Sequence, residues 1–175
     1  VSSRSFGVKI TDLSSLEEAV SFYTRHAAEK LRRQHSYAGA ITVFINTSRF
    51  NKPEENYSNA FRISLPIQTA STIALTKAAL CGLRKIYRRG YQFQKAGVML
   101  SELVDAQTRQ RDLFVPSSIS NKTKVMSVID AVNDRMGRGT IRLASEGISK
   151  KWLMRSGHKS QNYTTDWNEL ICVTK

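Results

Sequence analysis

Apolar and polar residues alternate in four short stretches of this chain, with the period of two that is typical of strands with one buried face. In the first stretch Phe6, Val8 and Ile10 are expected to face inward. Pro66 is expected to end the third stretch, because proline lacks the amide that a sheet needs. The polar residues 51–59 before that stretch should form a loop. We therefore predict strands over 3–10, 40–48, 61–65 and 91–103.

Two longer stretches repeat apolar residues with the helical period of about 3.6. The first begins at a capping box formed by Ser14 and Glu17, and it ends in cations that complement the helix dipole. Its apolar stripe consists of Leu16, Val20, Tyr23, Ala27 and Leu31. The second helix is predicted over 71–89, with Gly90 as its stop. The predicted order of elements is β-α-β-β-α-β.

That order predicts an α+β fold: a four-stranded, mostly antiparallel sheet with both helices on one face. The uncovered face would carry polar and basic side chains, which include Ser5, Lys9, Thr42 and Arg62. Such a face suits a phosphate backbone, although an antiparallel sheet can also simply face water on one side. The pattern alone leaves both interpretations open.

The pattern changes after the last predicted strand, and we expect a linker over 101–120 to divide the chain. This division gives a first domain, 1–115, and a C-terminal extension, 116–175. In the extension, spaced apolar residues predict a short amphipathic helix that ends at Gly137, followed by a strand over 140–144. The remaining tail contains aromatic residues, so we predict a small C-terminal α/β extension.

The chain of 175 residues has 27 Lys and Arg residues against 14 Asp and Glu residues, a formal net charge of +13. This excess favours a polyanionic partner such as nucleic acid through counterion release. Cys81 and Cys172 have no metal-ligand spacing with a histidine, which fits a reducing cytoplasm. No run of about 18 apolar residues is present, so we expect a soluble cytoplasmic protein without a membrane partner. The first residue is Val1 rather than Met, from which we expect a piece of a longer protein.

The acidic residues and histidines do not indicate a catalytic or metal-binding site. The carboxylates occur in pairs at a helix start, in a loop and at a strand end, and each pair has a structural explanation. His26, His35 and His158 lack the neighbours of a zinc site or a catalytic triad. We predict no catalytic residue, metal site or cofactor in this chain.

A separate signal follows the last predicted strand, in the segment Gln110-Arg111-Asp112-Leu113-Phe114. A glutamine followed by adjacent leucine and phenylalanine anchors is suited to docking in an apolar pocket of a partner. The segment resembles the pentapeptides with which bacterial proteins bind the sliding clamp. The alternative is that the two apolar residues fold back on their own domain.

Nine segments, in order along nearly the whole chain, carry a further resemblance. They are Arg4-Ser5-Phe6-Gly7, Ala27-Ala28-Glu29-Lys30-Leu31-Arg32, Phe44-Ile45-Asn46-Thr47-Ser48-Arg49-Phe50, Leu65-Pro66-Ile67-Gln68-Thr69, Gln94-Lys95-Ala96-Gly97-Val98-Met99-Leu100, Arg138-Gly139-Thr140, Gly147-Ile148, Trp152-Leu153-Met154 and Tyr163-Thr164-Thr165. Together they resemble the C-terminal part of Y-family translesion DNA polymerases of the UmuC branch.

The resemblance implies that residues 1–115 form the little-finger domain, whose sheet straddles the major groove of primer-template DNA and contacts mainly its backbone. The DNA-contact candidates are Arg4, Ser5, Lys9, Arg49, Arg62 and Lys95. Arg4 shares its parity with the inward Phe6, so it must lie at a sheet edge to reach DNA. The clamp-binding candidates are Gln110, Leu113 and Phe114.

The resemblance also implies partners and an activity for the complete protein. The partners are primer-template DNA, the sliding clamp, a UmuD′-type accessory subunit linked to the C-terminal tail, and the RecA filament of the SOS response. The catalytic fingers, palm and thumb would precede Val1, and the palm would bind Mg²⁺. This chain would then be the non-catalytic DNA-binding and clamp-tethering part of an error-prone translesion polymerase.

Two other functions are left open by the residues. A ferredoxin-like module that binds single-stranded RNA or DNA would stack bases on exposed aromatics of its central strands. Here only Phe44 has the parity of the uncovered face. A basic protein-interaction module, the other alternative, would fail to bind DNA even at low salt.

Overall fold

The computed structural model describes residues 1–50, 52, 55–107, 118–154 and 160–162, with the backbone alone described over 118–124. Four strands and three α-helices occur in these ranges, together with a short 3-10 helix in the C-terminal extension. They are β1 (Ser2–Ile10), α1 (Leu13–Arg33), β2 (Ser36–Thr47), β3 (Ser58–Thr69), α2 (Thr72–Ile86), β4 (Phe93–Asp105), α3 (Ser118–Met136) and η2 (Ala144–Glu146).

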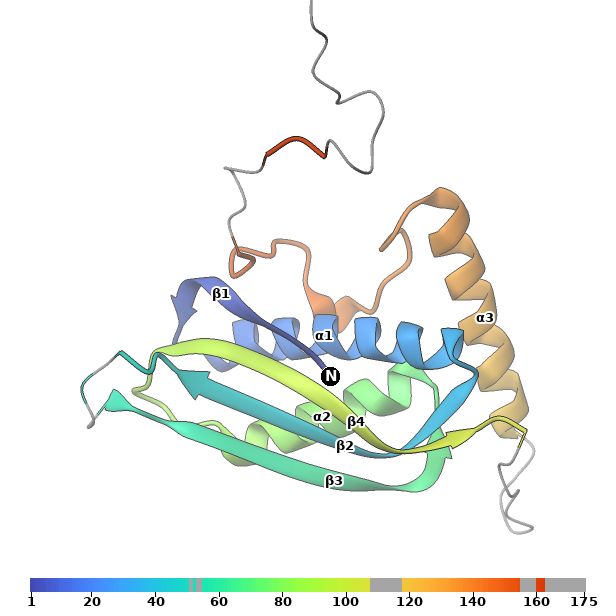
Figure 1. The fold of residues 1–175 in the computed structure, drawn as a ribbon, viewed down its shortest axis with the longest axis horizontal. Coiled ribbons are helices and arrows are strands. Elements are labelled where there is room, and N and C mark those ends of the chain that lie inside the picture. Colours follow the sequence, from blue (N-terminus) through green and yellow to red (C-terminus); the bar gives the residue numbers. More distant parts are fainter. Residues whose placement is uncertain (51, 53–54, 108–117, 155–159, 163–175) are drawn as a thin grey trace, which may run out of the picture.

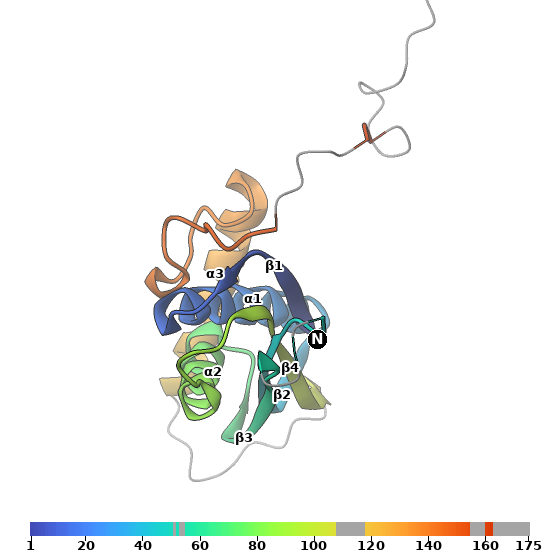
Figure 2. The same ribbon diagram turned by 90° about the vertical axis from the view of Figure 1, so that its left-hand side faces the viewer.

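The four strands form one antiparallel sheet in the order β1-β4-β2-β3. In Figure 1 the strands pass in front of α1 and α2, and the turned view in Figure 2 places both helices on the same side of the sheet. The predicted α+β fold, with two helices on one face, is therefore confirmed. Of the helices among the described residues, none is long and apolar enough to cross a membrane.

The core lies between the sheet and the two helices, and the alternation of the central strands builds it. Ile41, Val43 and Ile45 of β2 are fully buried, and Val43 is paired with the buried Val98 of β4. All five residues of the predicted stripe on α1 are buried as well. A strand with period two and a helix with period 3.6 each present one apolar side, and here these sides meet.

The first turn of α1 begins earlier than the capping box predicted. Asp12 is the N-cap residue, and its Oδ2 accepts a hydrogen bond from the Ser15 amide at 2.7 Å. The assignment of the cap to Ser14 was wrong, because a carboxylate two positions upstream satisfies the exposed helix amide. At the other end of the domain, α2 stops at Ile86 rather than at Arg89.

Two predictions failed in the outer strands, where pairing is irregular. β3 continues through Pro66 to Thr69, and its pairing with β2 shifts between Ser64 and Thr69. Because β3 is an edge strand, the missing proline amide leaves no partner unsatisfied. Val8 is 50% exposed rather than buried, since the pairing of β1 with β4 shifts along that part of the strand. A bulge of this kind breaks the strict alternation.

The C-terminal extension has the predicted helix but lacks the predicted strand. The helix α3 includes the expected residues, and it lies beside the end of α1 (Figure 1). The strand over 140–144 is wrong: the Thr140 hydroxyl donates to the Gly137 carbonyl at 2.8 Å, and η2 begins at Ala144. A turn closes the helix there, because glycine at positive φ ends it and a side chain satisfies the freed carbonyl.

Candidate nucleic-acid interface

The uncovered face of the sheet includes three cross-strand rows that follow from the register. We call this surface the open face. Its rows are Ser5–Lys95–Asn46–Ser58, Ser3–Gly97–Phe44–Ala60 and Met99–Thr42–Arg62. Most of these side chains are small or polar, so the backbone of the sheet is close to the surface. Such a surface can approach an extended polymer closely and offer hydroxyl, amide and cationic donors.

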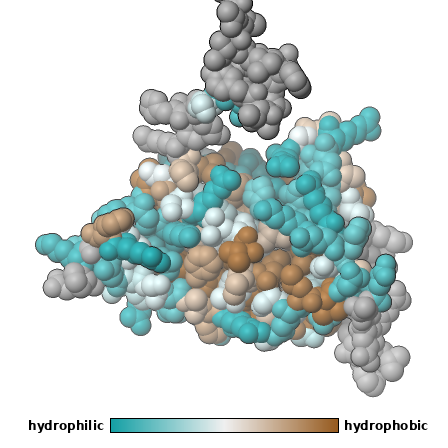
Figure 3. Space-filling model, viewed as in Figure 1, coloured by the Kyte–Doolittle hydropathy of each residue, from teal (hydrophilic) through white to brown (hydrophobic). Residues whose placement is uncertain are grey.

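An aromatic ring lies in the middle row. A Cβ on Gly97 would come within 2.5 Å of Phe44 Cζ and would overlap Ser3 Cβ. The Phe44 ring therefore lies directly over Gly97, and only glycine leaves space for it. Met99 in the next row is 40% exposed. Figure 3, which views this side of the molecule, shows an apolar centre with hydrophilic surface around it. The sequence had predicted a polar and basic face, and Phe44 and Met99 are the apolar departures from that prediction.

Three of the predicted DNA contacts lie on the open face. Ser5 and Lys95 are direct cross-strand neighbours on β1 and β4. Arg62 lies on β3 in the third row, and its guanidinium donates to the Glu102 carboxylate, with both side chains about half exposed. The charge of Arg62 is therefore partly compensated, whereas Lys95 has no carboxylate in its own row.

Arg4 lies on the other side of β1. It is paired with Ala96, a buried residue that belongs to the helix-covered face, and its carbonyl accepts a hydrogen bond from the Tyr23 hydroxyl at 3.5 Å. The side chain is exposed because β1 is an edge strand. This is the edge position that the parity argument required, so the structure separates Arg4 from the open-face group.

The two remaining candidates are exposed near one end of the sheet. Lys9 lies in the irregular part of β1, and Arg49 lies in the turn that follows β2. The register at this end pairs Thr47 with Phe93, the first residue of β4. Arg49 is therefore close to the start of β4 along the sheet.

Sequence reasoning missed two cations at this same end, Arg88 and Arg89, which follow α2. Both are exposed, and the Arg88 guanidinium lies 5.3 Å from the centre of the Tyr57 ring. Tyr57 precedes β3, and its hydroxyl donates to the Ile86 carbonyl at 2.6 Å, which ties the end of α2 to the start of β3. The predicted helix had included both arginines. The doublet before Gly90, outside any apolar stripe, was the signal that could have identified them.

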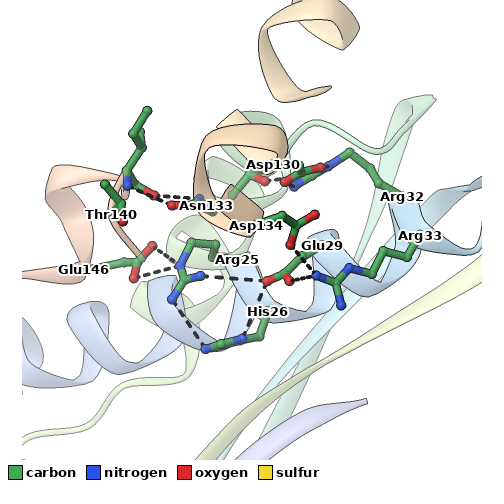
Figure 4. Close-up of polar contacts among 12 residues, drawn as sticks. Arg25, His26, Glu29, Arg32, Arg33, Asp130, Asn133, Asp134, Thr140 and Glu146 are labelled. Carbon is green, nitrogen blue, oxygen red and sulfur yellow. Dashed lines mark hydrogen bonds and ion pairs between the residues drawn. The ribbon is translucent and has the colours of Figure 1, made fainter. Parts of the chain in front are cut away.

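The described part of the extension packs against α1 and β1 through residues 144–152, which we call the docking segment. Glu146 is fully buried, and its Oε1 accepts a hydrogen bond from Arg25 Nε at 2.8 Å. Lys150 Nζ lies 3.8 Å from the other oxygen of this carboxylate. Figure 4 shows Arg25 held between Glu146 and Glu29, while Arg32 and Arg33 of α1 face Asp130 and Asp134 of α3. This cluster joins parts of the fold.

His26 lies beside this cluster and remains neutral at physiological pH. Burial, together with the positive charges of Arg25 and Lys150, lowers the pKa of His26 from 6.5 to about 4. Among the residues that the structure describes, no three His, Cys, Asp or Glu side chains are arranged to hold a metal ion. The segment with Gln110, Leu113 and Phe114 lies outside the described residues, so its role stays a prediction.

Comparisons with known proteins identify the family to which this chain is similar. Residues 1–113 match the impB/mucB/samB family C-terminal domain, and residues 123–173 match a domain of unknown function, DUF4113. The protein UmuC of Salmonella typhimurium is 37% identical over 174 residues, which cover 99% of this chain and 41% of UmuC. ImpB of Salmonella typhimurium is 37% identical over 171 residues, and MucB of Escherichia coli is 34% identical over 175 residues.

The chain spans only about two fifths of these curated relatives, since it covers 41% of UmuC and 40% of ImpB. The match to the family domain includes all four strands of the sheet and both helices that cover it. This chain therefore belongs to the impB/mucB/samB family and corresponds to the C-terminal region of a UmuC-type protein.

Proposed function

We propose that this chain is the non-catalytic DNA-binding part of an error-prone translesion DNA polymerase that acts in SOS repair and mutagenesis. The observation that carries the proposal is the open face, whose rows contain Lys95 and Arg62, with the Glu102 carboxylate paired to Arg62 beside them. The net charge of +13 adds long-range attraction to a polyanion. The bound nucleic acid would be primer-template duplex.

The chemistry of the open face supports contacts to the sugar-phosphate backbone rather than to base edges. Serine hydroxyls and the Lys95 ammonium donate hydrogen bonds to phosphate oxygens, and such contacts position a duplex without reading its sequence. Asn46 and Arg62 carry the amide and guanidinium groups that can read base edges, but both already have partners: Asn46 Oδ1 accepts a hydrogen bond from the Ser58 hydroxyl at 2.9 Å, and Arg62 donates to Glu102. A polymerase that must copy any template needs to bind DNA without a preference for base sequence.

Clamp tethering is the second part of the proposal. Gln110, Leu113 and Phe114 would dock in an apolar pocket of the sliding clamp, and the sequence pattern alone supports this role. The complete cytoplasmic protein would also bind a UmuD′-type accessory subunit and respond to the RecA filament. A palm domain of the complete protein would bind Mg²⁺, and we propose no cofactor for this chain.

One observation favours a second function, the binding of single-stranded nucleic acid. Phe44 lies on the open face of a central strand, where single-strand binders stack bases on aromatic rings. Its ring covers Gly97 and is only partly exposed. That packing leaves less of the ring available to a base, so we place duplex binding first.

A salt titration distinguishes these functions. Fluorescence anisotropy would measure binding of the chain to primer-template duplex and to single strand at several salt concentrations. We expect tighter binding to duplex, with little sequence preference and a steep salt dependence. Lys95→Ala should weaken duplex binding and lower the salt slope by about 0.9, the value for one phosphate contact. Preference for single strand would favour the second function.

The matched control is Lys77→Ala, since Lys77 is an exposed lysine of α2 on the covered side of the sheet. It changes the net charge by the same amount as Lys95→Ala but removes no group from the open face. Equal effects of the two variants would mean that only total charge matters, and the open face would lose its proposed role. Absence of DNA binding at low salt would leave a protein-interaction module.

A further inference from the structure

The strand β1 is held by two different parts of the chain. Ser5 is paired with Lys95 of β4, and Ile10 is paired with Phe93. An advance of five positions along β1 therefore corresponds to only two positions along β4. Between these points the pairing is irregular. The Gly7 amide instead donates a hydrogen bond to the Trp152 carbonyl at 3.1 Å. The docking segment thus supplies a backbone acceptor where the sheet does not.

The side chain of Trp152 fixes this acceptor in place. It is 3% exposed and belongs to the core cluster of the first domain. Its ring makes edge-to-face contacts with Phe6 of β1 and with Phe22 and Tyr23 of α1, at centroid distances of 6.1, 5.5 and 5.8 Å. Aromatic pairs of this geometry add to the free energy of burial.

Charged groups hold the same segment from its other end. Glu146 is paired with Arg25, and the Lys150 ammonium lies 4.1 Å from the centre of the Phe22 ring. Gly147 has a φ of +64°, and a Cβ at this position would overlap the Glu18 carboxylate of α1. The segment therefore contacts α1 through Glu146, Gly147, Lys150 and Trp152, although the matched family domain ends at residue 113.

We propose that Trp152 is a positioning residue for DNA binding: through its carbonyl and its ring it holds the irregular part of β1, and so places Lys9 and Ser5 for contact with the duplex. This inference rests on the proposed function. The docking segment lies 30 or more residues beyond the family domain, yet it sets the outer edge of that domain's sheet. A partner that displaces the docking segment would therefore change the positions of Lys9 and Ser5 through this contact.

Hydrogen exchange of the Gly7 amide, measured without DNA, reports the contact itself. We expect Trp152→Ala to accelerate exchange at Gly7 while the Val43 amide in central strand β2 stays protected. Trp152→Phe should restore protection at Gly7, because it keeps an aromatic ring, and the indole N–H that it removes has no acceptor among the described residues. Unchanged exchange at Gly7 in Trp152→Ala would overturn the inference.

The salt dependence of duplex binding reports the functional consequence. Trp152→Ala should weaken duplex binding and lower the salt slope by about 0.9 for each phosphate that the chain no longer binds. If Trp152 acts through Lys9, the double variant Trp152→Ala/Lys9→Ala should show the same slope as Trp152→Ala alone. Two independent reductions that add would show that Trp152 does not act through this lysine.

Further variants keep the test decisive. If Trp152→Ala also removes the protection of Val43, Gly147→Ala is the variant to use, because it displaces the docking segment without removing a core side chain. Faster exchange at Gly7 and a lower salt slope are expected for this variant too. Met154→Ala changes an exposed residue just beyond the segment and serves as the control. A wild-type chain that binds no duplex would reject the proposed function. If the wild-type chain binds duplex and both Trp152→Ala and Gly147→Ala bind it equally well, the role of Trp152 is rejected while the proposed function stands.

Discussion

Arg25 Nε lies 2.8 Å from Glu146 Oε1, although the two residues are 121 positions apart in the chain. The carboxylate is completely buried, and the side chain of Arg25 is 9% exposed. A buried ion pair costs desolvation when it forms, but removal of one partner leaves the other charge without compensation. This pair therefore makes the folded first domain depend on a residue of the extension.

Glu146→Ala should lower the free energy of unfolding by about 3 kcal/mol, because Arg25 and Lys150 would keep their charges in a site shielded from water. Urea denaturation measures the change. The control is Glu17→Ala, which breaks an ion pair with the largely exposed Arg84 and should therefore cost much less, because water screens this pair. Similar small losses in both variants would show that the Glu146 contact does not hold in solution.

The pKa of His26 predicts how stability changes with pH. Its value in the fold, about 4, is lower than the ordinary 6.5, first because of burial and then because of the charges of Arg25 and Lys150. Below pH 6.5 His26 is protonated in the unfolded chain, whereas in the folded chain it stays neutral down to about pH 4. The free energy of unfolding should therefore fall as the pH drops from about 6.5 towards 4.

His26→Gln is the variant that isolates this group, since it cannot take up the proton. Urea denaturation at neutral pH and near pH 5 should show a smaller loss of stability for the variant than for the wild type. An equal loss in both proteins would assign the pH dependence to other groups.

Gly97→Ala should destabilise the sheet by about 1–3 kcal/mol, the range for overpacking. The added methyl group would overlap Ser3 Cβ and meet Phe44 Cζ at 2.5 Å. Thermal unfolding measures the change. Phe44→Ala should partly relieve the strain in a double variant, because one of the two obstructing groups is removed. No loss of stability in Gly97→Ala would mean that the Phe44 ring does not lie over this glycine.

Glu102→Gln should strengthen duplex binding. The guanidinium of Arg62 donates to the Glu102 carboxylate, and the neutral amide would release its charge for a phosphate. The salt slope should become steeper by up to about 0.9. Arg62→Ala in the same anisotropy assay should have little effect in the wild-type background and a larger effect in Glu102→Gln. A slope that does not change in Glu102→Gln would place Arg62 outside the DNA contact.

Leu113→Ala/Phe114→Ala should abolish binding to the sliding clamp and leave duplex affinity unchanged. The two apolar anchors follow β4 in the sequence and belong to none of the rows of the open face. Surface plasmon resonance with immobilised clamp and anisotropy with duplex measure the two activities separately. Arg111→Ala, within the same segment but not an anchor, is the control for clamp binding. Parallel loss of both activities would contradict this division of roles.

The sequence by itself determined the order of strands and helices and the side of each that is buried. Ile41, Val43 and Ile45 alternate within one strand, and Leu16 and Val20 repeat along one helix, so neighbouring residues already carry this information. The antiparallel sheet with two helices on one face follows, because each apolar side needs a partner surface. Ser5, Thr42 and Arg62 could be assigned to the open face for the same reason.

Only the tertiary structure decided the irregular and long-range features. Val8 and Pro66 depart from the pattern because strand pairing shifts at sheet edges, and a shift depends on the neighbouring strand rather than on the local sequence. Trp152 and Glu146 gave no local signal for their contacts with β1 and α1. A buried aromatic ring and a buried carboxylate gain their free energy from groups distant in the chain, and only the folded arrangement specifies those groups.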